Sequence, residues 1–173
     1  MQFLNNKRIS DKSFFVQDGY TLAQQLIGKY ICRCADGEIK RYRITETECY
    51  IGTEDTACHA HKGRTRRTEI MWARGGVCYV YLCYGIHNML NFVSGNAEDP
   101  QAVLIRGVRG YDGPGKLTKA LAIDRSFNGE SLLTSDKIWL EDGEALSYTA
   151  TPRIGINYAE EKDRNALWRF VAE

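Results

Sequence analysis

Short apolar runs of β-branched and aromatic residues, interrupted by glycine turns, constrain the fold of this chain most strongly. One such run is Val77–Cys83, which reads Val-Cys-Tyr-Val-Tyr-Leu-Cys and ends where Tyr84-Gly85 interrupts it. This composition is typical of a buried strand, and residues 88–94 can return beside it as an antiparallel partner. No apolar run approaches the roughly 18 residues that a membrane-spanning helix needs. We therefore expect a soluble domain built on a β-sheet.

The remaining pattern predicts several more strands and few helices. The expected helices are residues 21–27, with Thr21 as a possible N-cap, and 114–122; the other expected strands are 30–34, 39–51, 102–108, 138–140, 153–156 and 167–171. A length of 173 residues is that of one domain. Because strands prevail, we predict a single α+β domain over residues 1–173, with a curved, mainly antiparallel β-sheet flanked by helices.

Charge is distributed unevenly, although the chain as a whole has a net charge of only +1. Residues 59–125 contain ten positively and five negatively charged side chains, whereas residues 126–173 contain five and nine. A basic central segment favours a polyanionic partner. Arg64, Arg66 and Arg67 are accordingly candidates for contacts with nucleic-acid phosphates.

The cysteines and the N-terminal segment indicate an intracellular protein. Residues 1–6 lead into Lys7-Arg8 without an apolar stretch, so we expect no signal peptide and a cytoplasmic location. Six cysteines in such a chain are expected to be free thiols. Cys32 and Cys34 are too closely spaced for a zinc-binding pair, and the offset between Cys78 and Cys83 directs them to opposite faces of one strand. No bound metal is expected.

The segment 110–116, Gly-Tyr-Asp-Gly-Pro-Gly-Lys, fits part of the phosphate-binding loop of nucleotide hydrolases. The next residue is Leu117, where such loops have the serine or threonine that binds Mg²⁺. We therefore expect neither ATP hydrolysis nor a nucleotide cofactor. A glycine-rich helix start with a lysine can still contact a phosphate, so Gly115 and Lys116 are candidates for that contact, and the alternative is a plain helix start.

Two neighbouring segments contain side chains suited to acid–base chemistry. In an extended strand Glu46, Glu48 and Tyr50 share one face, which is either a solvated outer face or a general base beside a ring that can stack. His59 follows in a polar segment, where loops often carry function. A lone histidine in such a segment is more often a hydrogen-bonding loop residue than a catalyst.

Tyrosines in and after the strand Val77–Cys83 are suited to contact with bases. Tyr79 and Tyr81 share one face of this strand, where they are either stacking platforms or core residues. Tyr84 falls at the expected hairpin tip, where a ring has no core to enter, and is a candidate wedge between base pairs. Together with the basic segments, these tyrosines favour nucleic acid as the partner.

The sequence resembles the alkyladenine (3-methyladenine) DNA glycosylase family over nearly its whole length. The segments that carry the resemblance are Thr45–His59, Tyr79–Asn91, Ala102–Arg106, Gly113–Leu117, Ala120–Ile123, Trp139–Glu141, Thr151–Gly155 and Trp168–Phe170. The resemblance implies a monofunctional base-excision enzyme. Base flipping needs only a monomer, so we expect a monomer, and we expect no cofactor. Such an enzyme flips a damaged purine, of the 3-methyladenine, 7-methylguanine or hypoxanthine type, out of double-stranded DNA and hydrolyses its N-glycosidic bond.

The resemblance also implies roles for the residues of the first segment and the tyrosine strand. Glu48 is expected to be the general base that activates the water attacking C1′ of the sugar. Tyr50, His59 and Tyr81 are expected to sandwich and hydrogen-bond the flipped base.

Further roles follow for residues of the hairpin and the next strand. Tyr84 is expected to fill the gap that the flipped base leaves, Asn91 to exclude the amino group of guanine, and Arg106 to approach the water and the target phosphate. His87 departs from the family pattern, which has a tyrosine at this position near the DNA, so contacts around the wedge are expected to differ.

Two alternative functions deserve comparison with this one. A zinc deaminase, which also flips bases, requires His-x-Glu and Pro-Cys-x-x-Cys, and neither motif occurs in the chain. A non-catalytic module that binds damaged DNA or RNA is the other alternative, because it could use the same aromatic surface. Glu48 argues against such a module, since a binding protein gains nothing from a carboxylate buried near phosphates.

Overall fold

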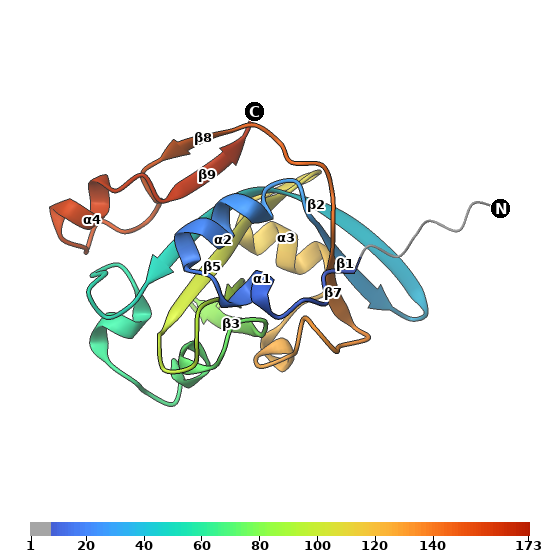
Figure 1. Ribbon diagram of the computed structural model, residues 1–173, viewed down its shortest axis with the longest axis horizontal. Helices are drawn as coiled ribbons and strands as arrows, with labels where there is room; N and C mark the ends of the chain where they lie inside the picture. Colours follow the sequence, from blue (N-terminus) through green and yellow to red (C-terminus); the bar gives the residue numbers. More distant parts are fainter. Residues whose placement is uncertain (1–7) are drawn as a thin grey trace.

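The computed structural model describes residues 8–173, and the N-terminal segment 1–7 considered above lies outside the described part. In residues 8–173 nine strands join in one mainly antiparallel sheet with four α-helices, which confirms the predicted α+β class (Figure 1). The strands are β1 Tyr30–Ala35, β2 Glu38–Ile51, β3 Cys78–Cys83, β4 His87–Val93, β5 Gln101–Val108, β6 Tyr111–Asp112, β7 Ile138–Glu141, β8 Tyr148–Thr151 and β9 Arg169–Ala172. The helices are α1 Ser13–Val16, α2 Gly19–Leu26, α3 Pro114–Ala120 and α4 Glu161–Asn165, with the 3-10 helices η1 His59–Lys62, η2 Glu69–Trp72 and η3 Arg125–Phe127.

The central sheet has the order β3-β4-β5-β2-β1-β7, and its longest strand, β2, connects the two halves. The first half of β2 pairs with β1 through a turn at Asp36 and Gly37, which both have positive φ as a tight hairpin requires. The second half pairs with β5, and Glu46–Glu48 also pair with β9 on the other side. A shift in register at Glu46 separates these two halves.

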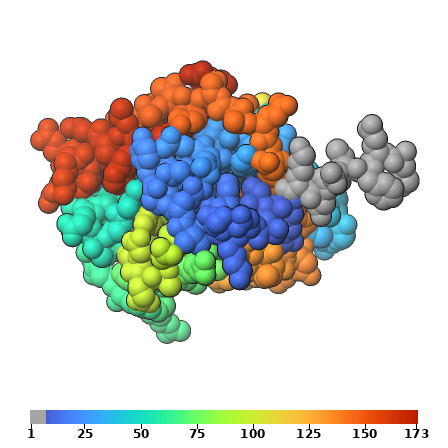
Figure 2. Space-filling view, in the orientation of Figure 1, coloured from blue at the N-terminus to red at the C-terminus, as the bar shows by residue number. Residues whose placement is uncertain are grey.

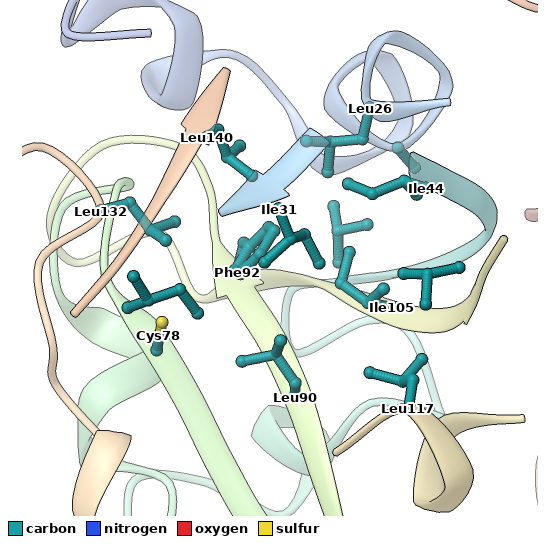
Figure 3. Close-up of a cluster of buried hydrophobic side chains, with 14 of the residues drawn as sticks. Leu26, Ile31, Ile44, Cys78, Leu90, Phe92, Ile105, Leu117, Leu132 and Leu140 are labelled. Carbon is teal, nitrogen blue, oxygen red and sulfur yellow. The ribbon is translucent and has the colours of Figure 1, made fainter. Parts of the chain in front are cut away.

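One face of the sheet forms the hydrophobic core. Figure 3 shows Leu90 and Phe92 of β4 and Ile105 of β5 beside Leu26 of α2 and Leu117 of α3, and all five side chains are completely buried. Burial of each such side chain contributes about 1.5–3 kcal/mol of stabilisation. The residues that alternate with them on the same strands point to the opposite face, which is therefore free to form a site.

The C-terminal segment closes one end of that opposite face. Strands β8 and β9 pair antiparallel, β9 joins the sheet at β2, and α4, between them in sequence, lies beside the segment that follows β2 (Figures 1 and 2). Asp163 in α4 accepts hydrogen bonds from the backbone and the hydroxyl of Thr56. The end of β2 and the C-terminal segment are thus held together although they are distant in sequence.

Two sequence predictions were wrong: the strand at residues 153–156 and the start of the helix at Thr21. Residues 153–156 are not a strand, because the Arg153 side chain enters the interior and the Ile154 N–H binds a side chain instead of a neighbouring strand. Helix α2 begins at Gly19 with Asp18 as its cap, because the Asp18 carboxylate accepts from the N–H of Thr21. In the part of the chain that is described, no helix is long and apolar enough to cross a membrane.

Candidate active site

A cavity of about 490 Å³ opens on the face of the sheet opposite the core. The residues that line it include Tyr50, His59, Tyr81, Asn91 and Arg106, all singled out in the sequence. They come from β2, β3, β4, β5 and the 3-10 helix η1, so only the folded sheet brings them together. A cavity of this size is large enough for a small planar ligand and has both apolar walls and convergent polar groups.

Glu48 lies behind this lining and is completely buried. Its two carboxylate oxygens have separate donors: Oε1 accepts from the Ile154 N–H at 2.7 Å, and Oε2 accepts from the Tyr50 hydroxyl at 2.7 Å. Burial raises the pKa of Glu48 above its ordinary value, and the Arg106 charge, these two donors and Arg153 oppose the rise. Burial and the Glu48 carboxylate also raise the pKa of Tyr50 well above 10, so its hydroxyl remains a donor.

Arg106 connects this carboxylate to a second one. Its Nε donates to Glu46 Oε1 at 3.2 Å and lies 3.6 Å from Glu48 Oε1. Arg169 of β9 also contacts Glu46, through Nε at 2.5 Å from the same oxygen. Glu46 therefore fixes the position of Arg106 at the cavity wall, with the guanidinium beside the Glu48 carboxylate.

Three aromatic side chains form one wall of the cavity. The ring centroids of His59 and Tyr81 are 4.6 Å apart, and those of Tyr79 and Tyr81 are 5.3 Å apart. His59 Nδ1 lies 2.9 Å from the hydroxyl of Tyr79, and Tyr79 as a residue is only 2% exposed. Burial, with the charges of Arg67 and Lys62, lowers the pKa of His59 to about 4, so its imidazole is neutral at pH 7.

Asn91 is held in one orientation inside the cavity. It is 3% exposed, and its amide nitrogen donates to the backbone oxygens of Tyr79 at 3.2 Å and Met89 at 3.4 Å. With these two donors engaged, the side-chain oxygen is its remaining polar atom. Asn91 therefore presents a fixed shape to any molecule in the cavity.

The β3–β4 hairpin places Tyr84 at the rim of the cavity, where its side chain is 92% exposed. Tyr84 has a φ of 49°, and Gly85 follows with 69°. A left-handed backbone is unfavourable for a bulky residue, whereas glycine adopts it readily. Ile86, the next residue, is 72% exposed, so the tip consists of two solvated apolar side chains.

The basic residues predicted to contact phosphates lie in different surroundings. Arg67 lines the cavity, with its guanidinium 5.3 Å from the centre of the Tyr81 ring. Arg64 is exposed but bound to the carboxylates of Glu69 and Glu98. Arg66 is exposed without such a partner in the described chain, and its contact with phosphate stays a prediction, as do those of Arg64 and Arg67.

The start of α3 lies close to the hairpin tip. Pro114 lines the cavity, Lys116 is exposed, and a β-carbon on Gly115 would come within 2.8 Å of Nδ1 of His87. Glycine at this position therefore allows the exposed His87 ring to approach the helix. Contacts of Gly115 and Lys116 with phosphate stay predictions.

Some residues of the site were not singled out in the sequence. Ile154 contributes through its backbone N–H, and a main-chain donor has no side-chain signal. Met71 of η2 and Tyr158, which is 68% exposed, also line the cavity. Tyr158 donates to the backbone oxygen of Ala57 at 2.8 Å, which only the fold reveals.

All six cysteines are free thiols, and four of them are buried. Within residues 8–173 there is no group of three or more His, Cys, Asp or Glu side chains that could hold a metal ion. The polar side chains that line the cavity include those of arginine, tyrosine, histidine and asparagine residues.

Comparisons with known proteins show the family to which the chain is similar. Residues 13–111 and 108–173 match the family described as Methylpurine-DNA glycosylase. A relative from Borreliella afzelii is 44% identical over 94% of this chain and 95% of its own length, and one from Psychrobacter cryohalolentis is 47% identical over 92% and 89%. A third, from Rickettsia felis, is 41% identical over 97% and 95%, and all three bear the name "Putative 3-methyladenine DNA glycosylase". The chain therefore belongs to the methylpurine-DNA glycosylase family.

Proposed function

We propose that this protein is a monofunctional DNA glycosylase that removes alkylated or deaminated purines from double-stranded DNA. Its substrates would be bases of the 3-methyladenine, 7-methylguanine and hypoxanthine type, and its product an abasic site. It would act as a cytoplasmic monomer without a nucleotide cofactor. Family membership supports the reaction class, and the buried carboxylate of Glu48 beneath an aromatic cavity supports the mechanism.

The observation that carries the proposal is the environment of Glu48. A completely buried carboxylate is costly unless it is bound by donors, and here two donors and the Arg106 guanidinium surround it. In the proposed step Glu48 accepts a proton from a water molecule, the water oxygen bonds to C1′ of the sugar, and the N-glycosidic bond breaks. The electron pair of that bond leaves with the base.

General-base assistance alone supplies about 10²–10⁴-fold acceleration, less than most enzymes achieve. The ionised carboxylate also stabilises the positive charge that develops on the sugar as the base departs. A cationic methylated purine is already a good leaving group, whereas neutral hypoxanthine depends more on the site. Arg106, held by Glu46, is suited to orient the water and the phosphate of the target nucleotide.

Base flipping is energetically feasible with the aromatic groups present. Extrusion of a paired base costs a few kcal/mol, and less when the base is damaged or mispaired. Each contact between a base and an aromatic ring returns about 1–3 kcal/mol. Tyr50, His59 and Tyr81 would contact the flipped base, and Tyr84 would occupy the gap in the duplex.

Selectivity would come from shape and from electron-rich rings. Asn91 is immobilised by its two hydrogen bonds, so it cannot turn away from the exocyclic amino group of guanine. A positively charged methylated base gains additional attraction from the tyrosine rings. Because His59 is neutral, it does not repel such a base.

The proposed activity can be tested by base release under single-turnover conditions. The substrates are three matched duplexes that contain hypoxanthine, 7-methylguanine or no lesion, each assayed with and without EDTA. We expect release from both damaged duplexes, none from the undamaged one, and no effect of EDTA. Binding to the damaged duplexes without release of either base would instead support a non-catalytic damage-binding module.

A further inference from the structure

Arg153 is an unusual residue in this fold because its charged side chain is entirely enclosed. Both Arg153 and its partner Asp55 have side chains that are 0% exposed, and two hydrogen bonds of 2.7 and 2.9 Å join the guanidinium to the carboxylate. Arg153 also donates to the backbone oxygens of Cys49 and Asp163. Such a buried pair has a large desolvation cost, and apolar residues often serve stability equally well. Its location therefore calls for a functional explanation.

The guanidinium of Arg153 lies over two aromatic rings. Its central carbon is 4.8 Å from the centre of the Tyr50 ring and 4.9 Å from that of the Trp168 ring. Planar guanidinium groups stack on aromatic faces in a way that the ammonium group of lysine does not reproduce. Arg153 thus fixes the plane of Tyr50 from the side of the C-terminal segment.

Arg153 also determines where its neighbour in sequence lies. Asp55 anchors the guanidinium and accepts from the N–H groups of Ile51 and Ala57, which fixes the turn at the end of β2. With Arg153 tied to that turn, the next peptide group directs the Ile154 N–H to Glu48 Oε1 at 2.7 Å. The two donors of Glu48, Tyr50 and Ile154, are consequently both positioned by Arg153.

We propose that Arg153 is a positioning residue for base excision, which holds Tyr50 and the Ile154 N–H against the carboxylate of Glu48. The proposal rests on the proposed function, because it assigns to Arg153 the organisation of the general base. Arg153 is not among the residues that line the cavity, so its role would be exerted through Tyr50 and Ile154. It acts by making the ionised form of Glu48 available at the base of the cavity.

Several charged and titratable groups surround Glu48, and the effect of Arg153 must be separated from theirs. They are Glu46 and Tyr50 from β2, Arg106 from β5, Arg169 from β9, and Tyr81, Arg153 and Tyr158. Arg153→Lys retains the positive charge but removes the bidentate contact and the stacking. A change in this variant therefore reports on positioning rather than on net charge.

The test is the pH dependence of single-turnover hypoxanthine release by wild type, Arg153→Lys and a control variant. The control is Arg41→Lys, because Arg41 also makes two hydrogen bonds to one carboxylate, that of Glu141, away from the cavity. Rates are expressed per folded site, which is counted by binding to a duplex with an abasic-site analogue. We expect the acid limb of the Arg153→Lys profile to move about one to two pH units upward, since weaker donors disfavour the carboxylate. At any pH below the wild-type acid limb, where the rate changes tenfold per pH unit, this corresponds to a loss of about 10- to 100-fold, and Arg41→Lys follows the wild type.

A purely structural role of Arg153 would lower the number of folded sites and leave the acid limb in place, and that result would overturn the proposal. Trp168→Leu removes one of the two rings and leaves the ion pair intact, so it provides the test if Arg153→Lys does not fold. Its acid limb should move in the same direction by a smaller amount, and an unmoved limb would again overturn the proposal. If the wild-type protein releases no base, the proposed function itself is overturned, rather than the role of Arg153.

Discussion

Tyr84→Gly should separate the stability of the fold from its action on DNA. Tyr84 has a φ of 49° and is 92% exposed, so the folded protein holds a bulky residue in an unfavourable conformation without packing it. The left-handed conformation costs an L-residue about 1–2 kcal/mol relative to the right-handed one. Glycine avoids this cost but loses about 0.5–1 kcal/mol more backbone entropy on folding. The variant is therefore expected to be as stable as wild type or more stable by up to about 1.5 kcal/mol.

The same change should impair excision from paired DNA. Without the ring, the gap in the duplex is unfilled and a stacking contact of about 1–3 kcal/mol is lost. This corresponds to roughly a 5- to 150-fold lower single-turnover rate when flipping limits release. The loss should be much smaller for hypoxanthine in a mismatch or bulge, because little energy is needed to extrude a base that is already unpaired.

The assay combines urea unfolding with hypoxanthine release from paired and bulged duplexes. Tyr111→Ala is a suitable control, because Tyr111 is an exposed tyrosine at 42% and is not among the cavity-lining residues. Equal loss of activity on the paired and bulged substrates would refute the wedge role of Tyr84. A loss of stability greater than about 1 kcal/mol would refute the argument about backbone strain.

Three further predictions concern the cavity and the start of α3. Because burial raises the folded-state pKa of Glu48, ionisation of this one group costs stability as pH rises above about 4.5, and Glu48→Gln should gain stability relative to the wild type in urea unfolding from pH 4.5 to 7.5; a constant difference would contradict the raised pKa. The folded-state pKa of His59 is lowered from 6.5 to about 4, so the contribution of this residue to the free energy of unfolding should fall by up to about 3 kcal/mol as pH falls from 6.5 to 4. His59→Asn should lose less stability over the same range; parallel stability curves would count against a neutral His59. Gly115→Ala should leave stability unchanged or raise it by up to about 1 kcal/mol, while displacement of His87 weakens binding to an abasic-analogue duplex several-fold; unchanged binding would show that this approach of His87 is unimportant.

Strand positions in this chain were predictable because the signal is local. The run Val77–Cys83 and its partner correspond to β3 and β4, and the expected strands 30–34 and 39–51 correspond to β1 and β2, which the Asp36-Gly37 turn joins. Alternation along β2 also placed Glu46, Glu48 and Tyr50 on one face, where Arg106 contacts both carboxylates. In each case a period of two residues or a turn residue determines the outcome without knowledge of distant segments.

Contacts between distant segments could not be predicted in the same way. Residues 153–156 have the composition of a strand, but the buried pair of Arg153 with Asp55 takes the segment out of the sheet. The donor to Glu48 from Ile154 is a backbone group, so no residue type marks it. For Arg64 the sequence indicates a candidate for phosphate contact but not the ion pairs with Glu69 and Glu98. These are properties of tertiary packing rather than of local pattern.

The most direct test of Glu48 as the general base compares chemistry with recognition in one variant. Glu48→Gln retains the shape of the side chain and an acceptor for one donor but cannot accept a proton from water. Single-turnover hypoxanthine release and binding to an abasic-analogue duplex are measured for wild type and variant at the same pH. We expect release to fall by at least about 100-fold while binding is unchanged, in line with the contribution of a general base. Release at the wild-type rate would contradict the role of Glu48, and loss of binding would show that the residue is structural.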